Sequence, residues 1–184
     1  PEGLRKSIDA VRKVAQQLRK ERNDEGALTF NVPEIKVVLD SEGRVERIDK
    51  KWQVEANQLV EEYMLLANKL VAQALHGNDI PTLYRVHEEP SEEQWQKMAV
   101  DLGALGVKEE PSCPEDLDRI AQGVAGTPLE APVTIAMLRN LNRAQYVSER
   151  REHFGLGFEH YVHFTSPIRR YPDMIVHRGL KALE

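Results

Sequence analysis

The sequence predicts an α+β fold that is predominantly helical and carries a small antiparallel sheet. Apolar residues recur at three- and four-residue steps in several long segments, as they do along one face of a helix. One shorter segment, residues 35–49, alternates on either side of a Ser-Glu-Gly turn, which is typical of an antiparallel hairpin. The 184 residues, 41% hydrophobic and 30% charged, are enough for one globular domain or a large part of one.

The first elements follow from these patterns. Leu4 to Arg22 is predicted to be a helix with an apolar stripe. Its opposite face is rich in arginine and lysine, which favours a solvated surface over a contact with a nucleic-acid backbone. Ala27 to Val32 is predicted to be a short strand. A hairpin follows, with arms at Ile35 to Asp40 and Arg44 to Asp49 and with Gly43 in the turn.

The rest of the chain is expected to alternate helices with short extended segments. Trp52 to Leu75 is predicted to be the longest helix, because nine apolar residues form a wide stripe along it. Further helices are predicted at Ser91 to Leu105, Pro114 to Val124, Pro132 to Val147 and Pro172 to Leu183, and extended segments at Thr82 to His87 and Tyr161 to Thr165. Ser166-Pro167 is a candidate helix start, followed by a turn around Arg169-Arg170.

Bulk properties narrow the class of protein. No apolar run of about 18 residues is present, so no membrane span is expected. The net charge of −5 does not favour a nucleic-acid-binding domain, although cations gathered in one channel can serve that purpose. The single cysteine, Cys113, cannot form a disulfide within the chain, and a reducing, cytoplasmic setting is expected. A start at Pro1 suggests a segment of a longer protein.

Adjacent arginines at 169 and 170 make the most unusual chemical feature of the chain. The planar guanidinium group of arginine matches phosphate oxygens, and backbone N–H groups at a helix start also favour an anion. The segment from Thr165 to Tyr171 is therefore a candidate phosphate site. The alternative is an arginine pair bound to nearby carboxylates such as Asp173 or Glu159, and the residues alone leave both interpretations open.

Four histidines cluster in the C-terminal part, at positions 153, 160, 163 and 177. Their spacing matches no standard zinc pattern, so packing or hydrogen-bonding roles are expected. Glu61 and Glu62 are adjacent on a predicted helix, and neighbours on a helix do not face the same way, so at most one is expected to face a site. Phe30 is expected either in the core or as a stacking platform for a base.

One long segment resembles a known family. From His153 to His177 the chain reads HFGLGFEHYVHFTSPIRRYPDMIVH, which is similar to the signature of the ribonuclease II/ribonuclease R catalytic domain, the RNB domain. Glu55 to Asn68, Tyr84 to Pro90 and Leu138 to Tyr146 also resemble family segments. The resemblance covers nearly the whole chain and identifies residues 1–184 as the C-terminal part of such a catalytic domain.

The resemblance implies a function and a set of site residues. Family members degrade single-stranded RNA processively from the 3′ end to nucleoside 5′-monophosphates, with magnesium held by an aspartate cluster. By motif position, Arg169 is implied to contact the scissile phosphate and to stabilise its developing charge. Phe30 is implied to stack on a 3′-terminal base, and Glu61 or Glu62 to lie near the terminal ribose. The other signature positions expected to bind RNA or to support the site are His163, Arg170 and Tyr171.

The sequence departs from the family in one respect. No clustered aspartates of the D-x5-D-x-D-D type occur in it, and in the family they lie N-terminal to the region seen here. The Mg²⁺ ligands are therefore expected outside this chain, and the isolated chain is expected to be inactive. It is expected to be a monomer or to pair with the N-terminal half of its own domain. The alternatives are a non-catalytic RNA-binding relative and a fragment that is stable only with that half.

Overall fold

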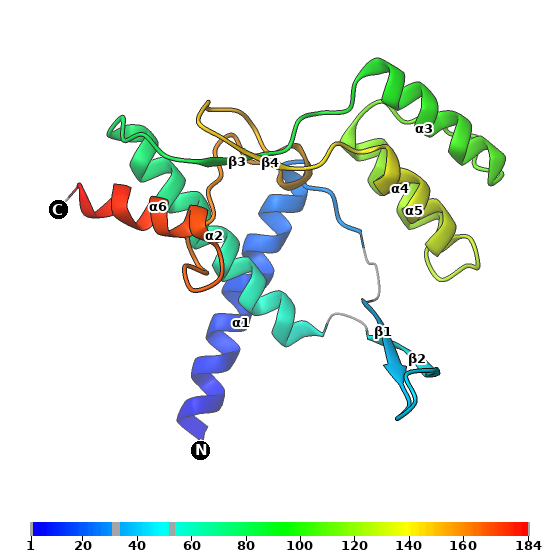
Figure 1. Ribbon diagram of the computed structural model, residues 1–184, viewed down its shortest axis with the longest axis horizontal. Coiled ribbons are helices and arrows are strands. Elements are labelled where there is room, and N and C mark those ends of the chain that lie inside the picture. The colour runs from blue at the N-terminus through cyan, green and yellow to red at the C-terminus, as the bar shows by residue number, and fades with distance from the viewer. Residues whose placement is uncertain (1, 31–33, 52–53, 184) are drawn as a thin grey trace.

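The computed structural model describes residues 2–30, 34–51 and 54–183. Two groups of helices lie on either side of a small central sheet, and a hairpin projects below them (Figure 1). The helices are α1 (Glu2–Asp24), α2 (Glu55–Gly77), α3 (Glu92–Ala104), α4 (Pro114–Val124), α5 (Glu130–Asn140) and α6 (Tyr171–Lys181), with a 3₁₀ turn at Phe154–Leu156. The strands are β1 (Glu34–Leu39), β2 (Val45–Lys51), β3 (Tyr84–Val86) and β4 (Gln145–Val147). The predicted class, mostly helical with small antiparallel sheets, is confirmed.

The first group contains α1, α2 and α6. Its core lies between α2, β3 and α6 and consists of the buried residues Ala72, Leu75, Tyr84, Val86, Val162 and Val176. Leu75, near the C-terminal end of α2, is fully buried. Helix α1 crosses α2, and the Tyr63 hydroxyl of α2 donates to the carbonyl oxygen of Val11 at 3.1 Å. This core holds α6, which carries the end of the C-terminal signature, against α2.

The second group packs α3, α4 and α5 around Met98, Leu102, Leu117, Ile120, Val133 and Met137. Helix α3 begins with a capping box. The backbone N–H of Gln94 donates to Ser91 Oγ, and the N–H of Ser91 donates to Gln94 Oε1 at 2.9 Å. The predicted start at Ser91 is therefore confirmed. The predicted bounds of α4 also agree with the structure.

A two-stranded sheet connects the groups. Strand β3 pairs antiparallel with β4, with Tyr84 opposite Val147. Tyr84 also forms an isolated antiparallel bridge with Val162, so the segment that begins at Tyr161 lies beside β3. This arrangement brings the signature segment, residues 153–177, which includes the start of α6, against α2.

Three sequence-based predictions are wrong in detail. The helix expected at Pro132 to Val147 ends at Asn140, because residues 145–147 pair with β3 instead. Residues 27–30 form no strand, and the remainder of the strand predicted to reach Val32 lies outside the described residues. No helix begins at Ser166, where the chain makes a turn before α6. The start expected at Trp52 for α2 also lies outside the described residues.

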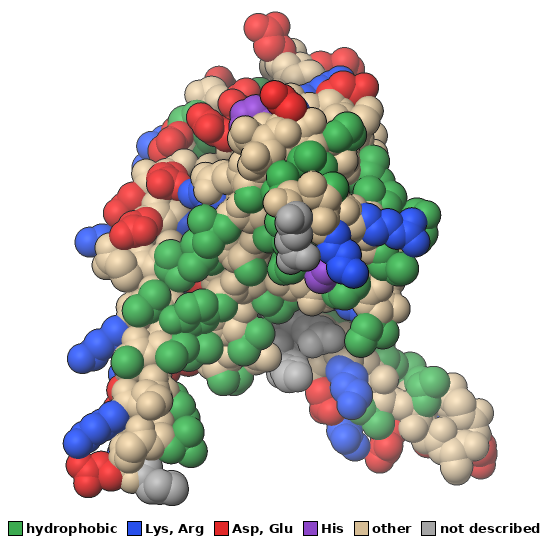
Figure 2. All heavy atoms as spheres, turned by 90° about the vertical axis from the view of Figure 1, so that its left-hand side faces the viewer, with side chains coloured by type: hydrophobic (Ala, Val, Ile, Leu, Met, Phe, Trp, Pro, Cys, Tyr) green, Lys and Arg blue, Asp and Glu red, His purple; other side chains and the backbone are tan. Residues whose placement is uncertain are grey.

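Apolar side chains are exposed on two projecting elements. In the first half of α1 they are Leu4, Ile8, Val11 and Val14, and on one face of the β1–β2 hairpin they are Ile35, Val37, Leu39, Val45 and Ile48. Figure 2 shows hydrophobic side chains beside lysine and arginine along α1. The periodicity of α1 was thus predicted correctly, but most of the first half of its stripe is not covered by the described residues. None of the helices in these residues is long and apolar enough to cross a membrane.

Candidate phosphate-binding site

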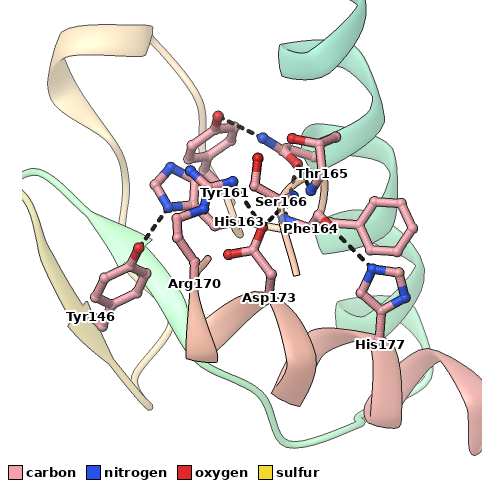
Figure 3. A network of polar contacts seen from close by, with 10 residues as sticks. Tyr146, Tyr161, His163, Phe164, Thr165, Ser166, Arg170, Asp173 and His177 are labelled. Carbon is pink, nitrogen blue, oxygen red and sulfur yellow. Dashed lines mark hydrogen bonds and ion pairs between the residues drawn. The ribbon is translucent and has the colours of Figure 1, made fainter. Parts of the chain in front are cut away.

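Asn68 of α2 anchors the signature segment to the first helical group. Figure 3 shows the three residues of that segment that it bonds, Tyr161, Phe164 and Thr165. Its side chain is 2% exposed. The Oδ1 atom accepts two consecutive backbone N–H groups, from Phe164 at 3.0 Å and Thr165 at 3.2 Å. The Nδ2 atom donates to the hydroxyl oxygen of Tyr161 at 2.9 Å. One buried amide therefore fixes three points of the segment that leads to the arginines.

Asp173 of α6 holds the next part of the segment. It is fully buried, and its Oδ1 atom accepts the N–H of Ser166 at 2.7 Å and Nη2 of Arg170 at 2.8 Å. The Arg170 side chain is only 18% exposed, so the ion pair is largely buried. A buried carboxylate needs a paired charge and hydrogen bonds, which Oδ1 obtains here, whereas Oδ2 is buried without a hydrogen-bond partner among the described residues. The Arg170 side chain therefore has a structural role, as the partner of Asp173.

Arg169 differs from its neighbour. Residues 166–170 form a turn, named here the arginine turn, in which the N–H groups of Arg169 and Arg170 both donate to the Ser166 carbonyl oxygen. The Arg169 side chain is exposed, and no ion pair forms to it among the described residues. The carboxylate interpretation thus holds for Arg170, and the phosphate interpretation remains for Arg169. No helix begins at Ser166, and the N–H groups of Ser166, Arg169 and Arg170 all donate to acceptors within the fold.

Two large side chains flank Arg169 in the open. Ile168 is fully exposed, and Tyr171, at the first position of α6, is 65% exposed. Tyr171, a predicted RNA-binding residue, is two residues after Arg169 in the sequence, and its ring is accessible to solvent. The turn therefore presents one cation and one aromatic ring on a backbone that Asn68 and Asp173 hold.

His163 lies behind this turn and is held neutral. Its Nδ1 atom shares a 2.6 Å hydrogen bond with the hydroxyl of Tyr146, whose ring also lies against the guanidinium of Arg85. Burial, followed by the positive charge of Arg170, lowers the pKa of His163 to about 4. A neutral imidazole beside the arginines adds no positive charge at neutral pH, so His163 acts through hydrogen bonding and packing.

The lowered pKa of His163 predicts a pH dependence of stability. Unfolded histidine has a pKa near 6.5, so between about pH 6.5 and 4 the unfolded chain binds more protons than the folded one. The free energy of unfolding should therefore be highest above that window and fall as the pH is lowered through it. Asparagine at 163 does not titrate, so His163→Asn should reduce the slope of melting temperature against pH in this window, to which His87 and His153 also contribute. An unchanged slope would contradict the assignment.

A pair of histidines, His87 and His153, supports the 3₁₀ turn. The N–H of Gly155 donates to Nδ1 of His87 at 3.0 Å, so the His87 proton is on Nε2, which donates to the Asn142 carbonyl oxygen at 2.9 Å. Burial lowers the pKa of His87. Burial, and then the neighbouring His87, lower the pKa of His153 to about 3. Both rings are therefore neutral structural groups.

Gly157 closes the 3₁₀ turn and is required there for two reasons. Its φ angle is +64°, and an added Cβ would lie 3.0 Å from the Glu25 carbonyl oxygen and 3.3 Å from the Ala27 nitrogen. Gly157→Ala should lower the free energy of unfolding by about 1–3 kcal/mol, measured by thermal or urea unfolding. Gly103→Ala is the matched control, because Gly103 is in α3 with nothing within 4 Å of an added Cβ. That variant should be neutral or slightly stabilising.

The structure separates Glu61 from Glu62. Glu62 is 3% exposed, and its two carboxylate oxygens accept Nη2 of Arg22 at 2.7 Å and Nε at 3.2 Å. The expectation of a solvated Arg22 is wrong, because this pair is buried between α1 and α2. Glu61 is exposed, and its charge contributes to raising the pKa of Tyr161, after burial as the main cause. Glu61 is therefore the exposed member of the pair, and Glu62 is the buried one.

Phe30 lies apart from the arginine turn. It is partly buried and packs against the core of the second helical group, together with Leu28 and Trp95. This agrees with the core interpretation of Phe30. Stacking on a base stays a prediction.

The remaining histidines are also engaged within the fold. His177 Nε2 donates to the carbonyl oxygen of Phe164 at 3.0 Å and its ring stacks on that side chain, while His160 packs against His76. Within residues 2–30, 34–51 and 54–183, no group of three or more His, Cys, Asp or Glu side chains could hold a metal ion. The described residues therefore do not fit a Mg²⁺ site, and no chemical step is assigned to a metal here.

Asn68 and His87 are the supporting residues that motif reasoning missed. Asn68 interrupts an apolar helix face formed by Leu65, Ala72 and Leu75, which are buried with it. A polar residue at such a position needs a buried hydrogen-bond partner, and this requirement is the signal in the sequence.

Comparison with known proteins identifies the family of this chain and several relatives. Residues 1–184 match the family model described as the RNB domain. The chain is 35% identical over 98% of its length to ribonuclease R of Escherichia coli and 41% identical over 89% of its length to that of Aquifex aeolicus. It spans 22% and 24% of those two proteins. It also matches Mycoplasma genitalium RNase R, solved with ribose-methylated single-stranded RNA, at a TM-score of 0.88 and 29% identity, covering 98% of this chain and 29% of that one.

Proposed function

Because this chain belongs to the RNB domain family, we propose that it is part of the catalytic domain of a 3′→5′ exoribonuclease that hydrolyses single-stranded RNA. The support is the match over the whole chain and the relatives named ribonuclease R. Since the chain spans less than a quarter of those relatives, the activity is proposed for the full-length protein. Within that protein, this segment is proposed to supply the phosphate-binding side of the active site.

The main observation behind the proposal is that the Arg169 side chain is exposed and able to bind a phosphate. Its exposed side chain extends from a turn whose backbone is held by Asn68 and Asp173, and its neighbour Arg170 is already paired. A guanidinium on a fixed backbone can donate two N–H groups to phosphate oxygens without reorganising as charge develops in the transition state. The catalytic contribution proposed for this chain is therefore electrostatic, and Arg169 provides it.

RNA is the proposed partner, supported by relatives solved with single-stranded and double-stranded RNA. We assign the exposed Tyr171 to a stacking contact, because an aromatic ring accepts any base on its face. Glu61 is assigned to the terminal ribose in preference to Glu62, because Glu61 is exposed whereas Glu62 is buried between α1 and α2. Phe30 as a stacking residue and His163 as a supporting residue complete the proposed RNA site.

The finer features of the activity are part of the same proposal. They are processive degradation, release of nucleoside 5′-monophosphates, and Mg²⁺ held by residues outside this chain. The free thiol of Cys113 is in keeping with a cytoplasmic setting. The isolated chain is proposed to be inactive, and either monomeric or paired with the N-terminal half of its own domain.

The direct test uses the full-length protein and single-stranded RNA labelled at its 5′ end, with Mg²⁺ and with EDTA. Progressive shortening of the labelled strand in Mg²⁺, with release of nucleoside 5′-monophosphates, is the expected result. The same DNA sequence serves as the control substrate. Retention of RNA on a filter without shortening would instead identify a non-catalytic RNA-binding relative.

The isolated chain tests the fragment alternative separately. Size-exclusion chromatography with thermal unfolding reports whether residues 1–184 form a stable monomer. A cooperative melt of a monomer would reject a fragment that needs its missing half. No cooperative melt, with recovery when the N-terminal part of the domain is added, would support that alternative.

A further inference from the structure

We propose that Asn68 is a positioning residue for Arg169, and that its buried amide sets the place of the arginine turn in the active site. This inference rests on the proposed function, because it concerns the reaction in which Arg169 acts. It assigns a role in turnover to a residue that touches neither substrate nor Arg169.

The orientation of the Asn68 amide is determined by its three partners. The N–H groups of Phe164 and Thr165 both need an acceptor, and Oδ1 lies 3.0 and 3.2 Å from them. On the other side, Nδ2 donates to Tyr161 Oη at 2.9 Å. A flipped amide would place its NH₂ group against two N–H donors. Asn68 therefore holds this backbone in one position.

Asp173 extends the anchoring by one residue. Its Oδ1 accepts the N–H of Ser166 at 2.7 Å, so three consecutive N–H groups, at positions 164 to 166, are bound by two buried side chains from two helices. The Ser166 carbonyl oxygen in turn accepts the N–H groups of Arg169 and Arg170. The path from Asn68 to the Arg169 backbone is thus a short series of hydrogen bonds.

This anchoring affects catalysis through the position of the Arg169 side chain. Among the described residues no carboxylate pairs with its guanidinium, so its position depends on the backbone that carries it. A displacement of about 1 Å in a catalytic group can lower a rate about 100-fold. Loss of the Asn68 acceptor should therefore affect turnover more than binding of RNA.

The experiment uses the full-length protein and measures kcat and KM for single-stranded RNA. Asn68→Ala removes the acceptor of two N–H groups, and we expect kcat to fall at least about tenfold while KM changes less than about threefold. Asn68→Asp keeps an acceptor for both N–H groups and should recover part of kcat. Tyr161→Phe keeps the core packing and removes only the partner of Nδ2, so it should show a smaller loss.

Leu75→Ala is the control for general damage to α2. Leu75 is fully buried in the same helix and belongs to a core cluster that contains no residue of the arginine turn. It should lower the melting temperature without the selective fall in kcat. If Leu75→Ala and Asn68→Ala change kcat and KM in the same proportion at matched stability, Asn68 is only a structural residue and the inference is wrong.

A double-mutant cycle distinguishes this inference from the proposed function. If Asn68 acts through Arg169, Asn68→Ala should lower kcat little further in a protein that already carries Arg169→Ala. Independent, multiplicative losses would overturn the positioning role while leaving Arg169 in the mechanism. Turnover that survives Arg169→Ala would instead remove the proposed function of Arg169, and the positioning role with it.

Discussion

Replacing Arg169 by alanine in the full-length protein is expected to lower kcat on single-stranded RNA about 100-fold or more, by analogy with loss of a preorganised donor to a developing negative charge. The affinity for RNA should change much less, because other contacts along the strand survive. Since no ion pair to Arg169 forms in the described part of the chain, the change should leave the melting temperature nearly unaltered. Single-turnover kinetics and filter binding measure the two effects separately.

Two comparison variants make the result specific. Arg169→Lys keeps the charge and loses the planar pair of donors, so it should recover only part of the activity. Arg178→Ala removes one positive charge from the exposed side of α6 and should leave kcat near that of the wild type. If Arg169→Ala retains wild-type turnover, Arg169 does not contact the scissile phosphate.

Replacing Asp173 by alanine is expected to be the most destabilising single change at the site, lowering the free energy of unfolding by about 3–5 kcal/mol. The substitution leaves the charge of Arg170 nearly buried without its partner and removes the acceptor of the Ser166 N–H. Removing one member of a buried pair costs more than removing both. Urea or thermal unfolding of the full-length protein, monitored by hydrogen exchange in α6, measures the loss.

The double variant Arg170→Met with Asp173→Leu tests the cause. Both replacements are apolar and of similar volume, so part of the stability lost in Asp173→Ala should return. Activity should not return with it, because the arginine turn would still lack the anchor of Ser166. A double variant less stable than Asp173→Ala would mean that the pair contributes through something other than charge compensation.

Local chemistry made some elements predictable and tertiary pairing made others unpredictable. The start of α3 followed from Ser91 and Gln94, because a capping box is complete within four residues. The end of α5 did not, since the apolar period continues through Leu141 while pairing with β3 selects an extended chain after Asn140. The helix propensity of residues 145–147 was outweighed by their pairing with β3, which lies about 60 residues earlier in the sequence.

The candidate site shows the same division. The residue types alone could not distinguish Arg169 from Arg170, and only the resemblance singled out Arg169, because the difference depends on which side chain reaches the buried Asp173. The choice between Glu61 and Glu62 depended likewise on Arg22, 40 residues away. Asn68 escaped notice because its partners lie more than 90 residues further along the chain.

The β1–β2 hairpin has a practical meaning for work with this segment. Its strands pair only with each other in the part of the chain described, so each has an outer edge of open backbone groups beside an apolar face. Such an edge can recruit a strand from another molecule, and self-association grows with concentration. Residues 1–184 produced alone should therefore aggregate above a certain protein concentration. Polar replacements at Val37 and Ile48 should raise that concentration. For the same reason, an expressed segment should be more stable if its ends are chosen to include residues that cover this hairpin.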